Sequence, residues 1–135
     1  MKIELKELTT CDVASDGEAV KLNFTDAAGI PVCLQVPFDG AQSIAMTLPR
    51  LLTRALRRIS GNDGARYVFP LESWSLAIVD ERNCLVATFA TEGGFEVSFG
   101  MAIEACRGLG ATLRDEADNL ERAADGGTDI PIRLN

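Results

Sequence analysis

Apolar and polar residues alternate along three segments in the first third of the chain. Residues 3–5, 20–24 and 30–36 carry apolar side chains at every second position, the pattern of a β-strand with one buried face. Two segments between these runs, SDGE at 15–18 and DAAG at 26–29, are rich in turn-forming residues. The pattern therefore predicts a meander of three antiparallel strands.

A helical spacing replaces this alternation between residues 44 and 59. Apolar residues recur there at every third or fourth position and make one face of an amphipathic helix: Ile44, Leu48, Leu51, Leu52, Leu56 and Ile59. Pro49 interrupts the pattern and leaves two alternatives. Either Thr47 caps a helix that begins near Pro49, or one longer helix kinks at this proline. Gly61 suits the C-terminal end of the helix in both cases.

The same order of elements then starts again. Alternating segments at 74–78, 85–89 and 95–99 predict strands, and a second amphipathic helix begins near Met101. At a constant offset of 65 residues, eight apolar positions and the turn glycines Gly29 and Gly94 coincide, although Phe24, Gly29 and Val32 alone among these are identical to their counterparts. Any two β-hairpins can be aligned by alternation alone. Here element order, turn position and helix agree together, which favours a tandem β-β-β-α duplication.

The expected fold is α+β, with an antiparallel sheet of about six strands and two helices packed on one face. We expect a single domain over residues 1–124, with half-repeats at about 1–61 and 66–122. The polar positions of the strands imply that the other sheet face is polar. Residues 125–135 form a C-terminal tail in which Ile130, Ile132 and Leu134 alternate like a short edge strand.

Composition and charge narrow the classes of partner. The 135-residue chain is 47% hydrophobic and has a formal net charge of -7, so its surface would repel a duplex nucleic acid unless a local basic patch intervened. No apolar run approaches the roughly 18 residues of a membrane span, and the opening MKIELKEL lacks the pattern of a signal peptide. We expect a bacterial-type cytoplasmic protein with no nucleic-acid and no membrane partner.

No motif in the sequence indicates catalysis. The chain has no histidine, which excludes Ser-His-Asp and Cys-His catalysis and metal sites with a histidine ligand. The four cysteines lack the close pairs that cysteine-only zinc sites need. The glycines of RGLGAT at 107–112 fall within a helical pattern, not at the strand-to-helix turn of a dinucleotide site. We therefore expect no catalytic residue, no metal and no cofactor, and an enzyme is the less favoured hypothesis.

A group of arginines is the most distinctive charged feature. Arg50, Arg54 and Arg57 share one face of the first helix, and no acidic residue lies between Ala41 and Ser60. Such a face could bind a phosphate or another anion. The alternative is a solvated face that complements the more acidic second helix, within a chain or between chains.

The leading functional hypothesis is a non-enzymatic binding or assembly domain that forms a homodimer. Strand edges and an uncovered sheet face favour association, and the tail after Gly126 and Gly127, or the small residues Gly108 and Gly110, could supply the contact. The competing hypothesis is an enzyme or binding protein for a small anionic ligand that uses Arg50, Arg54 and Arg57.

The scattered cysteines generate the first testable prediction. Cys11, Cys33, Cys84 and Cys106 are expected to be reduced and mostly buried thiols, because a chain of this length does not need disulfides to form a core. All four should react with an alkylating reagent in unfolded protein without reductant, as measured by mass spectrometry. Two cysteines that stay protected until a reductant is added would show a disulfide instead.

Overall fold

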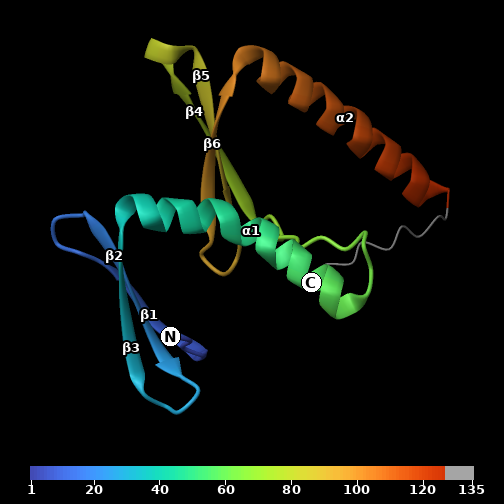
Figure 1. Ribbon diagram of the computed structural model, residues 1–135. Coiled ribbons are helices and arrows are strands. Elements are labelled where there is room, and N and C mark those ends of the chain that lie inside the picture. The colour runs from blue at the N-terminus through green and yellow to red at the C-terminus, as the bar shows by residue number, and fades with distance from the viewer. Residues whose placement is uncertain (127–135) are drawn as a thin grey trace. The chain divides into compact units, whose positions relative to one another are not determined.

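The structure is a computed structural model that describes residues 1–126 and contains two compact units, Met1–Tyr67 and a second unit that begins at Val68 (Figure 1). The first unit contains β1 (Leu5–Val13), β2 (Ala19–Asp26), β3 (Pro31–Pro37) and α1 (Phe38–Ser60). The second contains β4 (Ser73–Val79), the short 3-10 helix η1 (Asp80–Arg82), β5 (Cys84–Ala90), β6 (Glu96–Ala102) and α2 (Ile103–Asp125). The α+β class and the tandem β-β-β-α order are confirmed.

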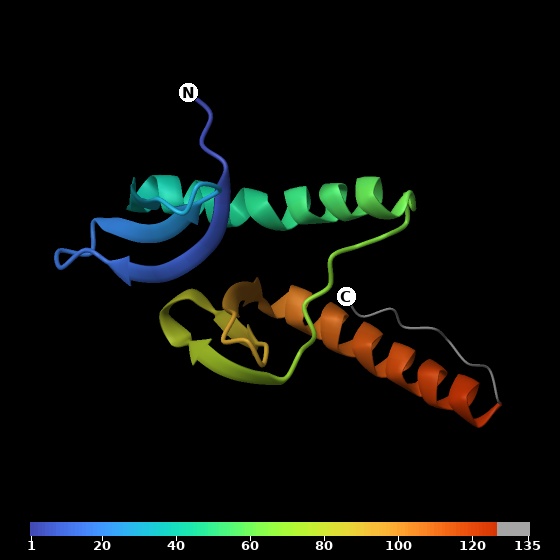
Figure 2. The ribbon, with the colours of Figure 1, turned by 90° about the horizontal axis from the view of Figure 1, so that it is seen from below.

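Six antiparallel strands are present, as expected, and they are divided between two three-stranded sheets. In the first unit β2 lies between β1 and β3, and in the second β5 lies between β4 and β6. Figure 2 shows each helix continuing directly from the third strand of its own sheet. The first strand begins at Leu5, later than the alternation at Ile3 predicted, and its pairing with β2 is irregular at two places.

The two units share their register at the offset of 65 residues. Leu22 pairs with Leu34 in the first sheet, and their counterparts Ala87 and Phe99 pair in the second. The bounds of β6 and α2 are those of β3 and α1 moved by 65 residues. The offset that aligned apolar positions in the sequence therefore also aligns the strand pairs and the helix ends.

Equivalent turns connect the second and third strands of each unit. Gly29 and Gly94 both have positive φ angles, 84° and 79°, and each N–H donates to the carbonyl three residues earlier. A three-residue loop that ends in a left-handed glycine is a common hairpin connection. In the first unit the Asp26 carboxylate also accepts hydrogen bonds from the N–H groups of Ala28 and Ile30, at 2.9 and 2.8 Å.

Helix α1 runs through Pro49 without a break. Of the two alternatives that the sequence allows, the structure has the single helix, and Thr47 is an interior residue whose hydroxyl donates to the carbonyl of Ser43 at 2.7 Å. A proline at this position removes the backbone hydrogen bond to the carbonyl four residues earlier. The helix ends at Ser60, and the left-handed conformation of Gly61 (φ 65°) fits the predicted C-terminal cap.

Each sheet has an apolar face under its helix and a more polar face opposite. Paired residues point to the same side of a sheet, so Lys21 and Gln35 share one polar face and Thr88 and Ser98 the other. Thr88 and Ser98 also bond to each other through their hydroxyls at 2.7 Å. The expectation of a polar second face is met at these positions.

Neither unit closes a core of large side chains. Within residues 1–126 the buried side chains are Ala19 and Ala87, which are 8% and 1% exposed. The middle strands β2 and β5 are half-buried along their lengths, while β1 and β4 at the edges are exposed throughout. One helix about 10 Å wide covers the middle of a sheet whose strands lie about 4.8 Å apart. The apolar residues at the sheet edges therefore stay open to solvent.

The cysteines and the C-terminal tail were the subject of two further predictions. No disulfide joins the cysteines among the described residues, but Cys11 and Cys33 are exposed and Cys84 and Cys106 are half-buried, so the prediction of mostly buried thiols is wrong for the first pair. Cys33 pairs with Asn23 on the polar face of its sheet. The predicted edge strand of Ile130, Ile132 and Leu134 lies outside the described residues.

Two glycines of the second unit allow a test of the backbone conformation. Gly108 lies inside α2, and a methyl group added there would meet no atom within 4 Å, so Gly108→Ala should stabilise the unit by up to about 1 kcal/mol through helix propensity. Gly94→Ala should destabilise it by roughly 1 kcal/mol, because alanine disfavours the positive φ angle. Urea unfolding followed by the fluorescence of Trp74, the one tryptophan, measures both. Equal effects of the two substitutions would contradict these conformations.

Candidate functional site

An apolar groove lies between the sheet and the helix of the second unit and encloses about 350 Å³. Strands β4 and β5 supply one wall, and the first half of α2 supplies the other. The residues that line it are Leu71, Trp74, Leu76, Leu85, Ala87, Phe89, Met101, Cys106, Leu109, Gly110 and Leu113. The volume is within the range of small-ligand pockets.

The groove has a closed floor and an open rim. Ala87 on the middle strand is buried, while Trp74 and Leu76 on the edge strand are 65% and 56% exposed. Leu113 on the opposite wall is 61% exposed. The alternation of β4 and the helical spacing of α2 aim these side chains toward one another across the groove. An apolar surface of this kind favours removal from water.

The groove contains no charged side chain and thus no acid–base pair among the described residues that line it. Its thiol, Cys106, is half-buried and lies 3.8 Å from the carbonyl oxygen of Met101. The groove can hold an apolar side chain or an apolar ligand.

The first unit has a related apolar surface. Leu34 on β3 and the helix residues Leu48, Leu51 and Leu52 are each exposed beyond a third of their area. Contact between the helix and β3 is close at one end, where a methyl group added to Gly40 would lie 3.1 Å from Val36. Farther along α1 the apolar stripe is open to solvent, and Ile59 near its end is 84% exposed.

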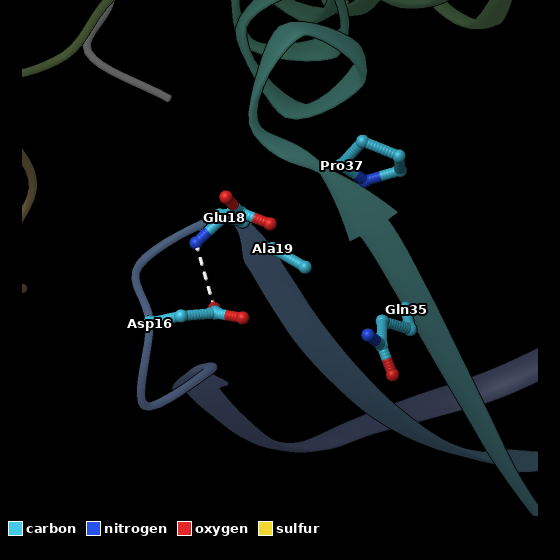
Figure 3. A pocket seen from close by; sticks show the side chains of 5 residues that line it. All are labelled: Asp16, Glu18, Ala19, Gln35 and Pro37. Carbon is cyan, nitrogen blue, oxygen red and sulfur yellow. Dashed lines mark hydrogen bonds between the residues drawn. The ribbon is translucent and has the colours of Figure 1, made fainter.

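A second, polar cup of about 400 Å³ lies in the first unit, where the β1–β2 turn meets the end of β3 (Figure 3). Asp16, Glu18, Gln35 and Pro37 surround Ala19. The Asp16 carboxylate accepts the N–H of Glu18 at 2.9 Å, so it stabilises the turn, a common role for aspartate. Both acids are exposed, and exposed carboxylates of this kind are weak candidates for acid–base chemistry.

The three arginines named from the sequence have different surroundings. Arg50 and Arg54 are exposed, and within residues 1–126 neither forms an ion pair with a carboxylate. Arg57 is half-buried, and its Nε donates to the carbonyl of Ala65 at 2.9 Å. This bond ties the segment after the helix back onto α1. An anion site at these residues stays a prediction, and one of its three members also has a structural contact.

Sequence reasoning identified the groove residues as apolar but assigned them to a core. Leu109 and Leu113 belong to the second amphipathic helix that the sequence predicts from near Met101, and Trp74 and Leu76 belong to the strand predicted at 74–78. The signal that could have shown their exposure is the repeat itself. A unit of three strands and one helix cannot bury its apolar face alone and needs a neighbour.

Metal-binding and membrane-spanning features are absent from the described part of the chain. Residues 1–126 contain no group of three or more His, Cys, Asp or Glu side chains placed to hold a metal ion. None of the helices in this part is both long and apolar enough to span a membrane. Comparison with models of protein families, with curated proteins and with solved structures finds no match.

Proposed function

We propose that the protein is a non-enzymatic binding and assembly module that works as a homodimer. The observation that carries this proposal is the open apolar face of each unit, because no large apolar side chain within residues 1–126 is buried. Monomeric proteins rarely expose large contiguous apolar patches, and such patches mark interaction sites. A second copy is the commonest partner for a surface of this kind, and two-fold pairing is the commonest closed arrangement.

The free energy available from burial supports association. Full burial of one leucine, isoleucine or phenylalanine contributes about 1.5–3 kcal/mol, and Leu76, Phe99 and Leu113 are each more than half exposed. Several such side chains together outweigh the several kcal/mol that association costs in lost freedom of motion. The groove of the second unit is the part of this surface with the form of a binding site.

A cytoplasmic location belongs to the same proposal. Cys11 and Cys33 are exposed thiols, and exposed thiols persist in compartments that keep cysteine reduced. The acidic net charge of -7 suits a protein that has no nucleic-acid partner.

Light scattering on the purified chain tests the homodimer. At micromolar concentration we expect a mass of about twice the 14.5 kDa of the chain, because a partner removes the open apolar faces from water. A chain ending at Asp125 serves as the control and should also dimerise, since the exposed faces belong to residues before that point. A monomeric mass for the full chain across the micromolar range would end the proposal.

A second candidate function is the binding of a small anion by the arginine face of α1. The observation that favours it is the exposure of Arg50 and Arg54 without a carboxylate partner in the described part of the chain. Guanidinium groups one helical turn apart can share a phosphate or carboxylate ligand.

Calorimetric titration with inorganic phosphate and with citrate tests the anion site. If the site exists, Arg54→Ala should weaken binding at least about tenfold, the loss of one charge-assisted contact. Arg82→Ala, which removes an arginine from η1 in the other unit, is the matched control and should leave binding unchanged. Equal weakening by the two substitutions would indicate a non-specific effect of net charge.

A further inference from the structure

The two long helices carry opposite net charge, which limits how two copies can associate. Helix α1 (Phe38–Ser60) contains four arginines and one aspartate, so its net charge is +3. Helix α2 (Ile103–Asp125) contains six acidic residues and three arginines, so its net charge is -3. Pairing of α2 with the α2 of another copy would bring like charges together, and so would pairing of α1 with α1. Pairing of α1 with the α2 of another copy brings opposite charges together, which favours the encounter and the register.

The exposed apolar area is large enough for a stable interface. The second unit has ten large apolar side chains that are each more than 40% exposed: Leu71, Trp74, Leu76, Ile78, Phe95, Phe99, Ile103, Leu109, Leu113 and Leu120. At roughly 150–250 Å² for each full side chain, these residues expose on the order of 1,000 Å². Standard interfaces bury about 800 Å² on each partner. The surface of one unit therefore meets the size of a whole interface.

The connection between the two units is short. The N–H of Tyr67 bonds to the Thr53 hydroxyl on α1 at 3.2 Å, so Tyr67 is tied to the first unit. Phe69 stacks on Phe95 of the second unit with ring centroids 4.5 Å apart. Val68 alone lies between these two attachments. The linker between these two attachments is therefore one residue long. Short hinges of this kind favour exchange between protomers.

We propose that in the homodimer the apolar stripe of α1 in each copy packs over the groove of the partner's second unit. This inference rests on the proposed function, because it specifies the interface of that dimer. Two-fold symmetry then produces two equal interfaces, each between unlike units. Leu48, Leu51 and Leu52 of one copy enter the groove between β4 and α2 of the other and cover Leu76 and Leu113.

Photo-cross-linking with isotope mixing tests this arrangement. Leu51 is replaced by the photoreactive residue p-benzoylphenylalanine, which keeps the position apolar. Unlabelled and heavy-nitrogen chains are mixed, dissociated and allowed to reassociate before irradiation. Mass spectrometry of the digest should find peptides that join residue 51 to the 71–76 or 103–125 segment, with one light and one heavy member. The same reagent at Arg50, which lies outside the apolar stripe, is the control and should give few such peptides.

The other cross-linking outcomes would contradict the proposed interface. Mixed-isotope peptides that join residue 51 to the first unit of the partner would overturn the inference and leave the homodimer intact. Peptides of one isotope alone would show pairing within a chain and overturn it as well. A wild-type chain that is monomeric by light scattering would remove the proposed function, and this inference with it.

Two substitutions give an independent measurement of the same interface. Leu51→Asp and Leu113→Asp should each raise the dimer dissociation constant at least about tenfold, because both faces take part. The matched controls Arg50→Ala and Ala111→Asp change the charge by the same amount away from the stripes and should change it less than about threefold. Leu51 and Leu113 are 45% and 61% exposed, and circular dichroism checks that the helices persist. Weakening by one of the two leucine substitutions alone would indicate an interface of like units and overturn the inference.

Discussion

The structure depends on a difference in width, because one helix is too narrow to cover the whole apolar face of a three-stranded sheet. A helix covers the middle strand of its sheet, so Ala87 is 1% exposed while Phe99, its neighbour on β6, is 53% exposed. The uncovered edges belong to the same apolar face that a core would need. Burial of apolar area is the dominant favourable term in folding, and small units bury proportionally less of it. Each unit thus forms its strands and helix but leaves part of the stabilising burial to another surface.

Much of the fold could be predicted from the sequence because the relevant signals are local. Alternation at Leu22, Leu34 and their counterparts indicates which side of each strand is apolar, and the left-handed glycines Gly29 and Gly94 mark the hairpin turns. The division into two sheets was not predicted, because alternation says which face is apolar and not which edges pair. The length of α1 could not be decided from the sequence, because Pro49 can begin a helix or lie within one.

The candidate site could be predicted only in part, for a related physical reason. An apolar stripe such as that of Leu109 and Leu113 has the same pattern whether the chain's own core or a partner covers it. The arginines were easy to find because charge is visible in the sequence. The bond from Arg57 to Ala65 was not, because it depends on a loop that returns to the helix. That same return brings Tyr67 onto Thr53 and shortens the junction between the units.

The units agree in backbone and differ in surface, and the difference has a consequence for recognition. Shared turns and shared strand register place equivalent apolar faces at equivalent positions. Both units therefore have an apolar face that is stabilised when another surface packs on it. If the helices had also kept the same charge, every pairing of units would bring like charges together. The opposite net charges of α1 and α2 instead favour association of unlike units and disfavour association of like units. Specificity requires such a repulsion as well as an attraction. In the proposed homodimer, two surfaces of one chain select each other in a second copy, and closed two-fold pairing covers both surfaces so that neither can recruit a further molecule.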